Sequence, residues 1–451
     1  MKHLHDIPSA FKHEFANPRL WWSRAVVVGM AAIAGLVVVG FTWLAEEALD
    51  LFLFFDGKAW WFALLWTPAC AALLVWLTRR YAMGAAGSGI PQVMATLDPA
   101  VAPEQRSLFV SLKLSAAKIV LTAGGLLGGL SLGREGPSVQ IAAGVMLAAR
   151  RWLPRHSQVS AHSLLVAGGA AGIAAAFNTP LAGVMFAIEE LSRSPEQRNS
   201  GLIVAGIVLA GMMAVSIHGN ATHFGIIHPG PIGLALALPG LLVTLVAGVA
   251  GGLFARLLLA SARGNPLGKL SAWRKGRPVL FAAVCGVLVA AIGIASHGAT
   301  FGSGTVVTRA MLEGSSDVAP AFVAFKYVAT WLTVWSGVPA GIFAPSLAIG
   351  AGIGHDIAVL LHYPHAPALI ALGMVGFLAA ATQAPLTAFI IVMEMVDGHA
   401  MVLSLMACAM VARTISNVIS APLYSVLAQQ QLAGLVGPDT SRLGTSAVTP
   451  A

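Results

Sequence analysis

The sequence predicts an all-α polytopic membrane protein. Hydrophobic residues make up 57% of the 451 residues and charged residues only 10%, and the mean hydropathy is +0.81. Soluble domains carry about 25% charged residues, so a surface this poor in charge fits a lipid bilayer rather than water. Several apolar stretches reach the length of about 20 residues that a helix needs to cross the hydrocarbon core.

The first 24 residues predict a cytoplasmic arm ahead of the first membrane span. They mix polar and apolar residues, and an apolar run at 25–44 follows them. This polar lead is longer than that of a signal peptide, and no cleavage-site pattern follows it. Lysine and arginine favour the cytoplasmic side of a membrane, and four of them lie in the arm: Lys2, Lys12, Arg19 and Arg24.

The formal net charge of +8 could suggest a nucleic-acid partner, but the positions of the basic residues favour a membrane protein. Lysine and arginine lie mainly at the edges of apolar segments, as they do in short cytoplasmic loops. No basic run is long enough to follow a phosphate backbone, so we expect no nucleic-acid partner. We expect a multi-pass protein of the cell (inner) membrane, in contact with the lipid bilayer and with both termini cytoplasmic.

Two long apolar stretches predict broken helices. Residues 199–255 carry no Asp, Glu, Lys or Arg, and between Lys326 and Glu394 the only formal charge is Asp356. Each stretch has room for two or more passes, yet glycine and proline interrupt it, for example at 337–339. Broken helices occur in lipid only where protein or a wet cavity shields the unpaired backbone. Many transporters build a site near the membrane midplane from such interrupted spans.

An internal repeat indicates two homologous halves. Residues 172–181 and 377–386 share an alanine triplet and a Pro-Leu pair at an offset of 205 residues, and Glu189 matches Glu394 at the same offset. Alanine-rich coincidence does not explain the matched glutamate. The repeat alone leaves open whether the halves are inverted or parallel. We expect an N-terminal arm at 1–24 and two transmembrane halves at 25–220 and 231–420. A C-terminal helix with a short cytoplasmic tail is expected at 421–451.

Three clusters of glycine and proline lie at breaks in the apolar pattern and predict helix N-termini. Proline suits the first turn of a helix, where its missing N–H would be unpaired anyway. Helix N-termini attract anions through free N–H groups and about half a positive charge, although one cluster alone also fits a plain helix cap. No Walker lysine or preceding strand supports a nucleotide site. The clusters are Gly87-Ser88-Gly89-Ile90-Pro91, Gly133-Arg134-Glu135-Gly136-Pro137 and Gly341-Ile342-Phe343-Ala344-Pro345.

Glu135 is an ionisable residue deep in an apolar region, which is a functional hypothesis by default. A carboxylate is itself an anion, so it can occupy the place of a permeating anion and leave when protonated. The structural alternative is an ion pair with Arg134 or Lys118. Glu189 and Glu190 end another apolar helix, where the alternative is a solvated helix end.

The cysteines and histidines predict neither disulfides nor a metal site. Three cysteines lie in apolar stretches without CxxC spacing, which is typical of small buried hydrophobes. The 13 histidines are scattered. His362 and His365 have i,i+3 spacing, but Pro364 interrupts them and no acidic third ligand is near. The cysteines are Cys70, Cys285 and Cys408.

These motifs, in this order and followed by Pro422-Leu423-Tyr424, resemble the chloride channel and chloride/proton exchanger (CLC) family over about residues 25–430. The resemblance implies two inverted-topology halves with many tilted, broken and re-entrant helices. It also implies a homodimer with one ion pathway per subunit, chloride and protons as the transported ions, and no cofactor. Residue 340 is alanine where a second glycine is common in the family, and cytoplasmic regulatory domains of many relatives have no counterpart after Tyr424.

The resemblance also assigns roles to individual residues. Ser88 and Tyr424 would donate hydroxyl groups to a central chloride, and Ile342 and Phe343 would donate backbone N–H groups. Glu135 matches the gating glutamate that carries the proton at the outer end. Glu190, rather than Glu189, matches the internal proton glutamate of the exchangers, and Lys118 matches an intramembrane lysine for which we expect a structural role.

Both glutamates together favour a chloride/proton antiporter, and serine in the first cluster resembles chloride-selective members rather than nitrate-preferring ones. The alternative within the family is a passive chloride channel in which Glu135 only gates. An alternative from another class is an intramembrane serine hydrolase with Ser88 as nucleophile. That enzyme would need a histidine base within hydrogen-bond reach, for which His399, close to Asp397, is the candidate.

Overall fold

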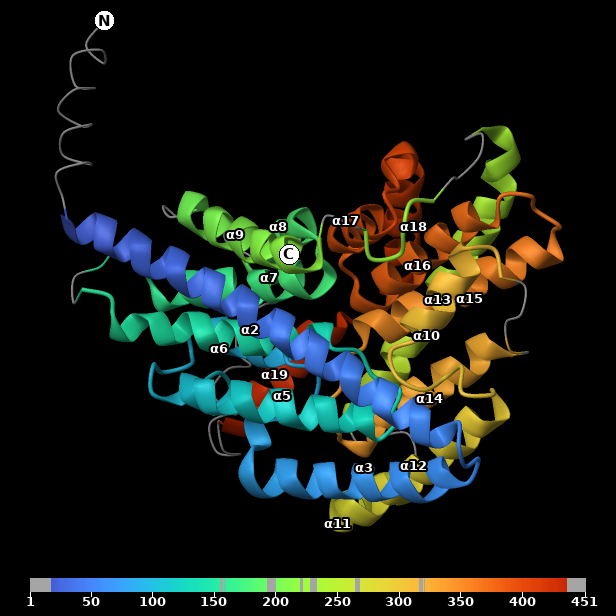
Figure 1. Ribbon diagram of the computed structural model, residues 1–451, viewed down its shortest axis with the longest axis horizontal. Helices are drawn as coiled ribbons and strands as arrows, with labels where there is room; N and C mark the ends of the chain where they lie inside the picture. The colour runs from blue at the N-terminus through green and yellow to red at the C-terminus, as the bar shows by residue number, and fades with distance from the viewer. Residues whose placement is uncertain are drawn as a thin grey trace, which may run out of the picture.

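The structure is a computed structural model, and its helices run across and around one another without a sheet in the described part of the chain (Figure 1). It describes residues 18–435 except 155, 156, 158, 193–199, 220, 221, 228–232, 264–267, 316–318 and 320. The expected arm at 1–24 and the tail after 435 thus lie largely outside the described residues. An all-α membrane protein is confirmed: seven helices among the described residues are long and apolar enough to cross a membrane.

The helices fall into two series on either side of the loop near residue 225. The first series is α2 (Pro18–Asp56), α3 (Phe62–Tyr81), α4 (Ile90–Leu97), α5 (Leu112–Leu127), α6 (Glu135–Ala148), α7 (Ala161–Phe177), α8 (Pro180–Phe186) and α9 (Ser200–His218). The second series is α10 (Leu234–Arg263), α11 (Gly268–Gly276), α12 (Pro278–Ala295), α13 (Thr305–Leu312), α14 (Phe322–Ser336), α15 (Phe343–Leu360), α16 (Ala366–Thr382), α17 (Pro385–Met395), α18 (Val402–Ile419) and α19 (Leu423–Leu435).

Several helices are too short to cross a membrane. A span needs about 20 helical residues, whereas α4 and α13 each have 8 residues and α17 has 11. The predicted break at 337–339 falls between α14 and α15, and Tyr363-Pro364 stands between α15 and α16. Broken and re-entrant helices are therefore confirmed, and their ends lie inside the protein, where other helices shield the backbone.

The repeat found in the sequence corresponds to matched helix ends. Asn178 closes α7 and Gln383 closes α16 in the left-handed conformation, with φ of 58° and 62°. Asparagine tolerates this conformation better than most residues. Pro180 and Pro385 then stand in the first turns of α8 and α17, where no N–H is needed. The two halves thus change direction in the same way at equivalent positions.

The centre of the molecule is built from α6, α7, α15 and α16. α6 packs on α7 and α15 packs on α16, and every residue of α16 from Ala368 to Thr382 is buried. Small residues allow this closeness, as they do between membrane helices. A Cβ atom on Gly350 of α15 would overlap the Gly373 carbonyl of α16.

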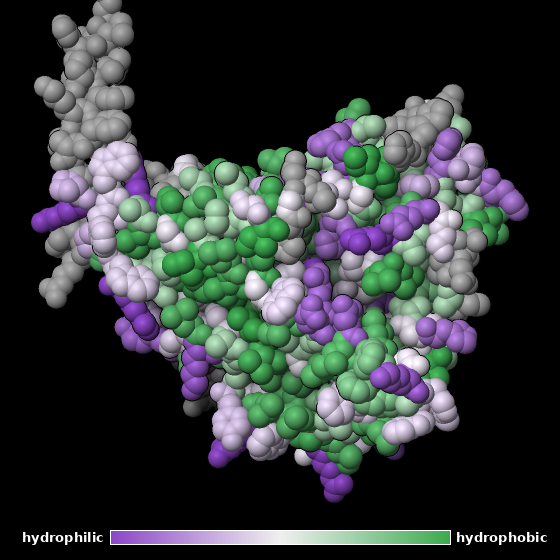
Figure 2. Space-filling view, in the orientation of Figure 1, coloured by the Kyte–Doolittle hydropathy of each residue, from purple (hydrophilic) through white to green (hydrophobic). Residues whose placement is uncertain are grey.

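The outer helices keep apolar side chains on the surface. Figure 2 shows broad apolar areas on the viewed face, interrupted by a polar area near its middle. Exposed apolar side chains occur along α2, α3, α10, α12 and α18, including Trp43, Leu65, Leu241, Leu288 and Leu403. Apolar exposure on this scale marks a surface that contacts lipid or another protein.

Candidate functional site

The loop before α4 places Ser88 between two glycines with left-handed backbone. Gly87 and Gly89 have φ of 76° and 110°, which side chains with a Cβ rarely adopt. The Gln92 amide group fixes the loop, since its oxygen accepts from Gly89 N at 2.9 Å and its nitrogen donates to the Ala86 carbonyl. The Ser88 hydroxyl oxygen is buried and has no hydrogen-bond partner among the described residues, so it is available to a ligand.

Lys118 supports this loop from α5. Its side chain is fully buried, and Nζ donates to the carbonyls of Ala85 at 2.8 Å and Gly87 at 2.5 Å. A buried ammonium group is costly without partners, and here backbone oxygens supply them. This geometry agrees with the expected structural role and gives Lys118 no contact with Glu135.

A reciprocal backbone bridge joins the second and third clusters. Gly133 N donates to Gly341 O at 2.8 Å, and Gly341 N donates to Gly133 O at 3.1 Å. The first cluster lies against the second, because a Cβ on Gly136 would overlap Ser88 Oγ. The three clusters that the sequence singled out therefore meet at one place, with the N-termini of α4, α6 and α15.

The Glu135 carboxylate lies at the start of α15. Its Oε2 accepts a hydrogen bond from Ala344 N at 3.3 Å, and the side chain is only 3% exposed. An acceptor at this position satisfies an N–H group that has no partner within its own helix, and the helix dipole favours its negative charge. Among the described residues no ion pair joins Glu135 to Arg134 or Lys118, although the Arg134 charge acts on the Glu135 carboxylate.

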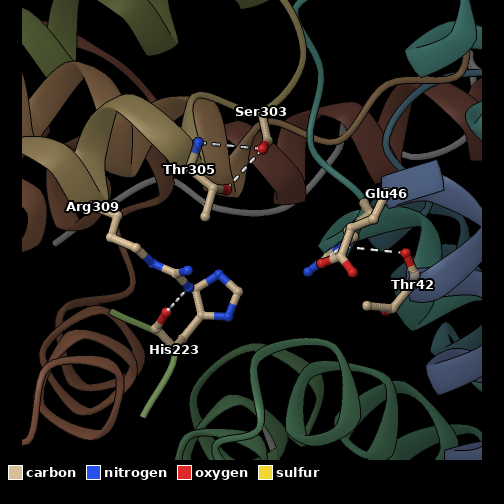
Figure 3. Close-up of polar contacts among 7 residues, drawn as sticks. Thr42, Glu46, His223, Ser303, Thr305 and Arg309 are labelled. Carbon is tan, nitrogen blue, oxygen red and sulfur yellow. Dashed lines mark hydrogen bonds and ion pairs between the residues drawn. The ribbon is translucent and has the colours of Figure 1, made fainter. Parts of the chain in front are cut away.

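Arg134 pairs with Glu46 of α2 instead. The guanidinium Nη1 lies 2.6 Å from Glu46 Oε1 and donates to the Thr42 carbonyl at 3.3 Å. Figure 3 shows Thr42 and Glu46 of α2 opposite Arg309 of α13, which donates to the His223 carbonyl at 2.6 Å. Arg134 and Arg309 thus come from different halves, and Arg134 is paired with the Glu46 carboxylate.

Tyr424 approaches the same place from α19. Its ring stacks on the Phe343 ring, with centroids 6.1 Å apart and planes inclined by 14°. Tyr424 is 1% exposed, and its hydroxyl oxygen has no hydrogen-bond partner among the described residues. A cavity of 290 Å³ is lined by Ser88, Tyr424 and Ile342, among others. The hydroxyl groups of Ser88 and Tyr424 and the residue before α15, Ile342, thus line one cavity. Hydroxyl groups and helix N-termini are donors that suit an anion.

Glu189 and Glu190 lie in a single π-helical turn, Ala187–Leu191, at the end of α8. Such turns are frequent at functional sites. The Glu189 carboxylate accepts from Leu386 N at 3.0 Å and Thr387 N at 2.7 Å, in the first turn of α17. Glu189 is therefore a helix cap rather than the solvated end considered as its alternative.

The arrangement required for a serine hydrolase is missing from the described residues. His399 Nε2 lies 3.4 Å from Asp397 Oδ1, but both side chains are exposed, and no histidine is among the residues that line the cavity of Ser88. In the described ranges no group of three or more His, Cys, Asp and Glu side chains is arranged to hold a metal ion. Cys285 and Cys408 are buried and Cys70 is half-buried, all with free thiols.

Sequence reasoning missed the counterpart of Lys118. Lys326 of α14 is fully buried, and its Nζ donates to Thr300 O at 3.0 Å and Gly302 O at 2.7 Å. The supported loop contains Gly302-Ser303-Gly304 ahead of α13, as Gly87-Ser88-Gly89 stands ahead of α4. A search for a second Gly-Ser-Gly would have found the signal.

The fold and the converging helix ends define an integral membrane protein that handles an anion. The family described as "Voltage gated chloride channel" matches residues 70–417, about three quarters of the sequence. The chain belongs to this family, and it is accordingly a transport protein for chloride and not an enzyme.

Solved structures of similar fold support the same architecture. A slow cyanobacterial Cl⁻/H⁺ antiporter matches with a TM-score of 0.78 and 24% identity, over 91% of this chain and 98% of the other. A CLC-type fluoride/proton antiporter matches at 0.74 and 22%, over 90% and 97% of the two chains. A eukaryotic CLC transporter matches at 0.71 and 20%, over 91% and 74%. The fold with two inverted halves is thereby confirmed.

Proposed function

We propose that the protein exchanges chloride for protons and that Glu135 is its gate. The observation that carries the proposal is the place of the Glu135 carboxylate, which accepts from Ala344 N at the start of α15. A helix N-terminus is where an anion binds, so the carboxylate occupies a chloride position. When Glu135 is protonated it loses its charge, and chloride can replace it.

We assign chloride binding to donors at the start of α15 and in the cavity lined by Ser88 and Tyr424. Ser88 and Tyr424 supply the two buried hydroxyl groups without partners. Ile342 and Phe343 supply amides at the start of α15, where the first four N–H groups have no acceptor in the helix. The set contains no full positive charge, which suits an ion that must leave as readily as it binds. Serine at position 88 favours chloride over nitrate.

Glu190 is proposed as the internal proton glutamate. Its neighbour Glu189 is committed to the N-terminus of α17 through two hydrogen bonds, so the two adjacent carboxylates have different surroundings. Glu190 lies in the π-helical turn Ala187–Leu191, a feature that is frequent at functional sites. Protons would pass between Glu190 and Glu135 while chloride passes through the Ser88 cavity.

We further propose a homodimer in the inner membrane with one pathway in each subunit and both termini cytoplasmic. Exposed apolar side chains on α8 and α18, such as Leu181 and Leu403, exposed by 54% and 75%, support a contact with lipid or a second copy. Cross-linking in liposomes and protease access to tagged termini test these two points.

The experiment is the zero-current voltage of reconstituted protein under a chloride gradient, with and without a pH gradient. Moving one charge across 100 mV is worth about 2.3 kcal/mol, so coupled protons shift this voltage. We expect a shift with pH. A voltage that follows chloride alone would overturn antiport in favour of the passive channel. Replacing chloride with nitrate or fluoride in the same vesicles tests the anion preference.

A further inference from the structure

The cavity lined by Ser88 and Tyr424 is also lined by a half-buried arginine, Arg274. Its lining reaches from these two hydroxyl groups to Arg274 of α11 and to Gln430 and Gln431 of α19. α11 is a short basic helix outside the apolar spans, with Lys269, Arg274 and Lys275. The anion site and a cationic side chain therefore share one cavity of 290 Å³.

A rigid support holds the Arg274 guanidinium in this wall. Nη1 donates to the Ser261 carbonyl of α10 at 3.0 Å. The Ser261 hydroxyl in turn accepts from Trp331 Nε1 at 2.9 Å. The Trp331 ring stacks on Trp335, with centroids 4.9 Å apart and planes inclined by 17°. The stacked Trp331 therefore holds Ser261 in place, and Ser261 in turn holds Arg274.

The charge of Arg274 is not neutralised by a carboxylate among the described residues. Its charged neighbour is Arg79, at the end of α3, which has the same sign. Burial lowers the pKa of the Arg274 guanidinium, yet arginine stays protonated in proteins. A guanidinium has five N–H donors and is weakly hydrated, so those not used on Ser261 suit a small anion.

We infer that Arg274 forms an anion-capture site at the α11 mouth of the pathway, through which chloride reaches Ser88 and Tyr424. A cation beside a cavity with low-dielectric walls raises the local concentration of anions. Chloride would meet Arg274 before it reaches the site at Ser88 and Tyr424. Arg274 therefore increases the chloride occupancy of that site without adding a full positive charge to it. This inference rests on the proposed chloride transport.

The kinetic test compares Arg274→Gln with Lys275→Gln, which removes the same charge from the exposed next residue. In proteoliposomes we expect Arg274→Gln to raise the half-saturating chloride concentration about tenfold, the low end of such focusing effects. Maximal turnover and the chloride-to-proton ratio stay unchanged, and Arg274→Lys restores part of the affinity. A half-saturating concentration equal to that of the Lys275→Gln control would overturn the inference.

A second test does not depend on transport. A reporter cysteine, Gln430→Cys, is placed in the cavity wall after the half-buried Cys70 is replaced by alanine. We expect an anionic methanethiosulfonate reagent to react with it faster than a cationic one, and Arg274→Gln to abolish that preference. A preference that survives Arg274→Gln would refute the capture site even in a protein that transports chloride. If Arg274→Gln abolishes the preference for the anionic reagent but the protein carries no chloride, the capture site stands and only the proposed function is refuted.

Discussion

Lys118 and Lys326 lie 208 residues apart and make the same contacts in opposite halves of the protein. Each is fully buried, and each donates to two backbone carbonyls of a Gly-Ser-Gly loop or of the residues just before it. In the first half that loop presents Ser88 to the anion cavity. In the second half Ser303 makes a local hydrogen bond to Thr305 at 2.8 Å instead. The two halves thus share the lysine-supported loop, and their serines make different contacts.

Lys326→Met is expected to destabilise the protein without changing the chloride-to-proton ratio. It leaves two buried carbonyls without a donor, at about 1–3 kcal/mol each, offset in part by removal of a buried charge. Thermal unfolding in detergent measures the change. Lys113→Met, at an exposed position on α5, is the control, and an equal midpoint for the two variants would show that Lys326 contributes nothing.

Glu135→Gln is expected to abolish proton coupling while chloride still flows. The amide has the shape of the protonated acid but cannot lose its proton, so the gate stays displaced from the start of α15. The zero-current voltage then follows chloride alone, and the chloride flux loses its dependence on pH. Exchange driven by a pH gradient in this variant would contradict the assignment of Glu135.

Glu190→Gln and Glu189→Gln are expected to differ although the residues are adjacent. Glu190→Gln stops proton movement and leaves chloride flux and folding intact. Glu189→Gln lowers the unfolding temperature, because the charged acceptor of two α17 amides is lost; hydrogen bonds to charged groups contribute about 1.5–3 kcal/mol each. Loss of both fluxes in well-folded Glu190→Gln protein would assign a structural role to Glu190.

Gly341→Ala is expected to impair chloride binding. A Cβ at this position would lie 2.6 Å from the Gly133 carbonyl oxygen and 3.0 Å from Pro137 Cδ, so the backbone bridge must open. Calorimetric titration with chloride should show weaker binding than in wild-type protein. Gly206→Ala, whose Cβ would be 3.6 Å from Ala31 Cβ, is the control, and equal affinities in the two variants would rule out a tight bridge.

The sequence was sufficient for the features that are encoded locally. Glycine and proline mark the ends of α4, α6 and α15, and the matched Glu189 and Glu394 reveal the repeat. Pairings between distant segments were not predictable in this way. The contact of Arg134 with Glu46 and that of Arg274 with Ser261 depend on how α2, α6, α10 and α11 pack, and no spacing along the chain records that packing.

The repeat in the sequence does not predict which groups Glu189 and Glu394 contact. A matched glutamate at the end of each apolar helix could have faced water in both halves. Instead Glu189 caps α17 and Glu394 caps α8, where it accepts from Leu181 N at 3.2 Å and Ala182 N at 2.9 Å. This exchange is a property of the two-fold relation between inverted halves, which a single half cannot reveal.

The bridge between Gly133 and Gly341 has a consequence for biosynthesis. A ribosome releases the first half well before residue 341, and Tyr424 follows later still. Until then Gly133 has no partner, the Glu135 carboxylate has no α15 amide to meet, and the anion cavity lacks most of its wall. The anion cavity can therefore form only after the second half and α19 have been synthesised.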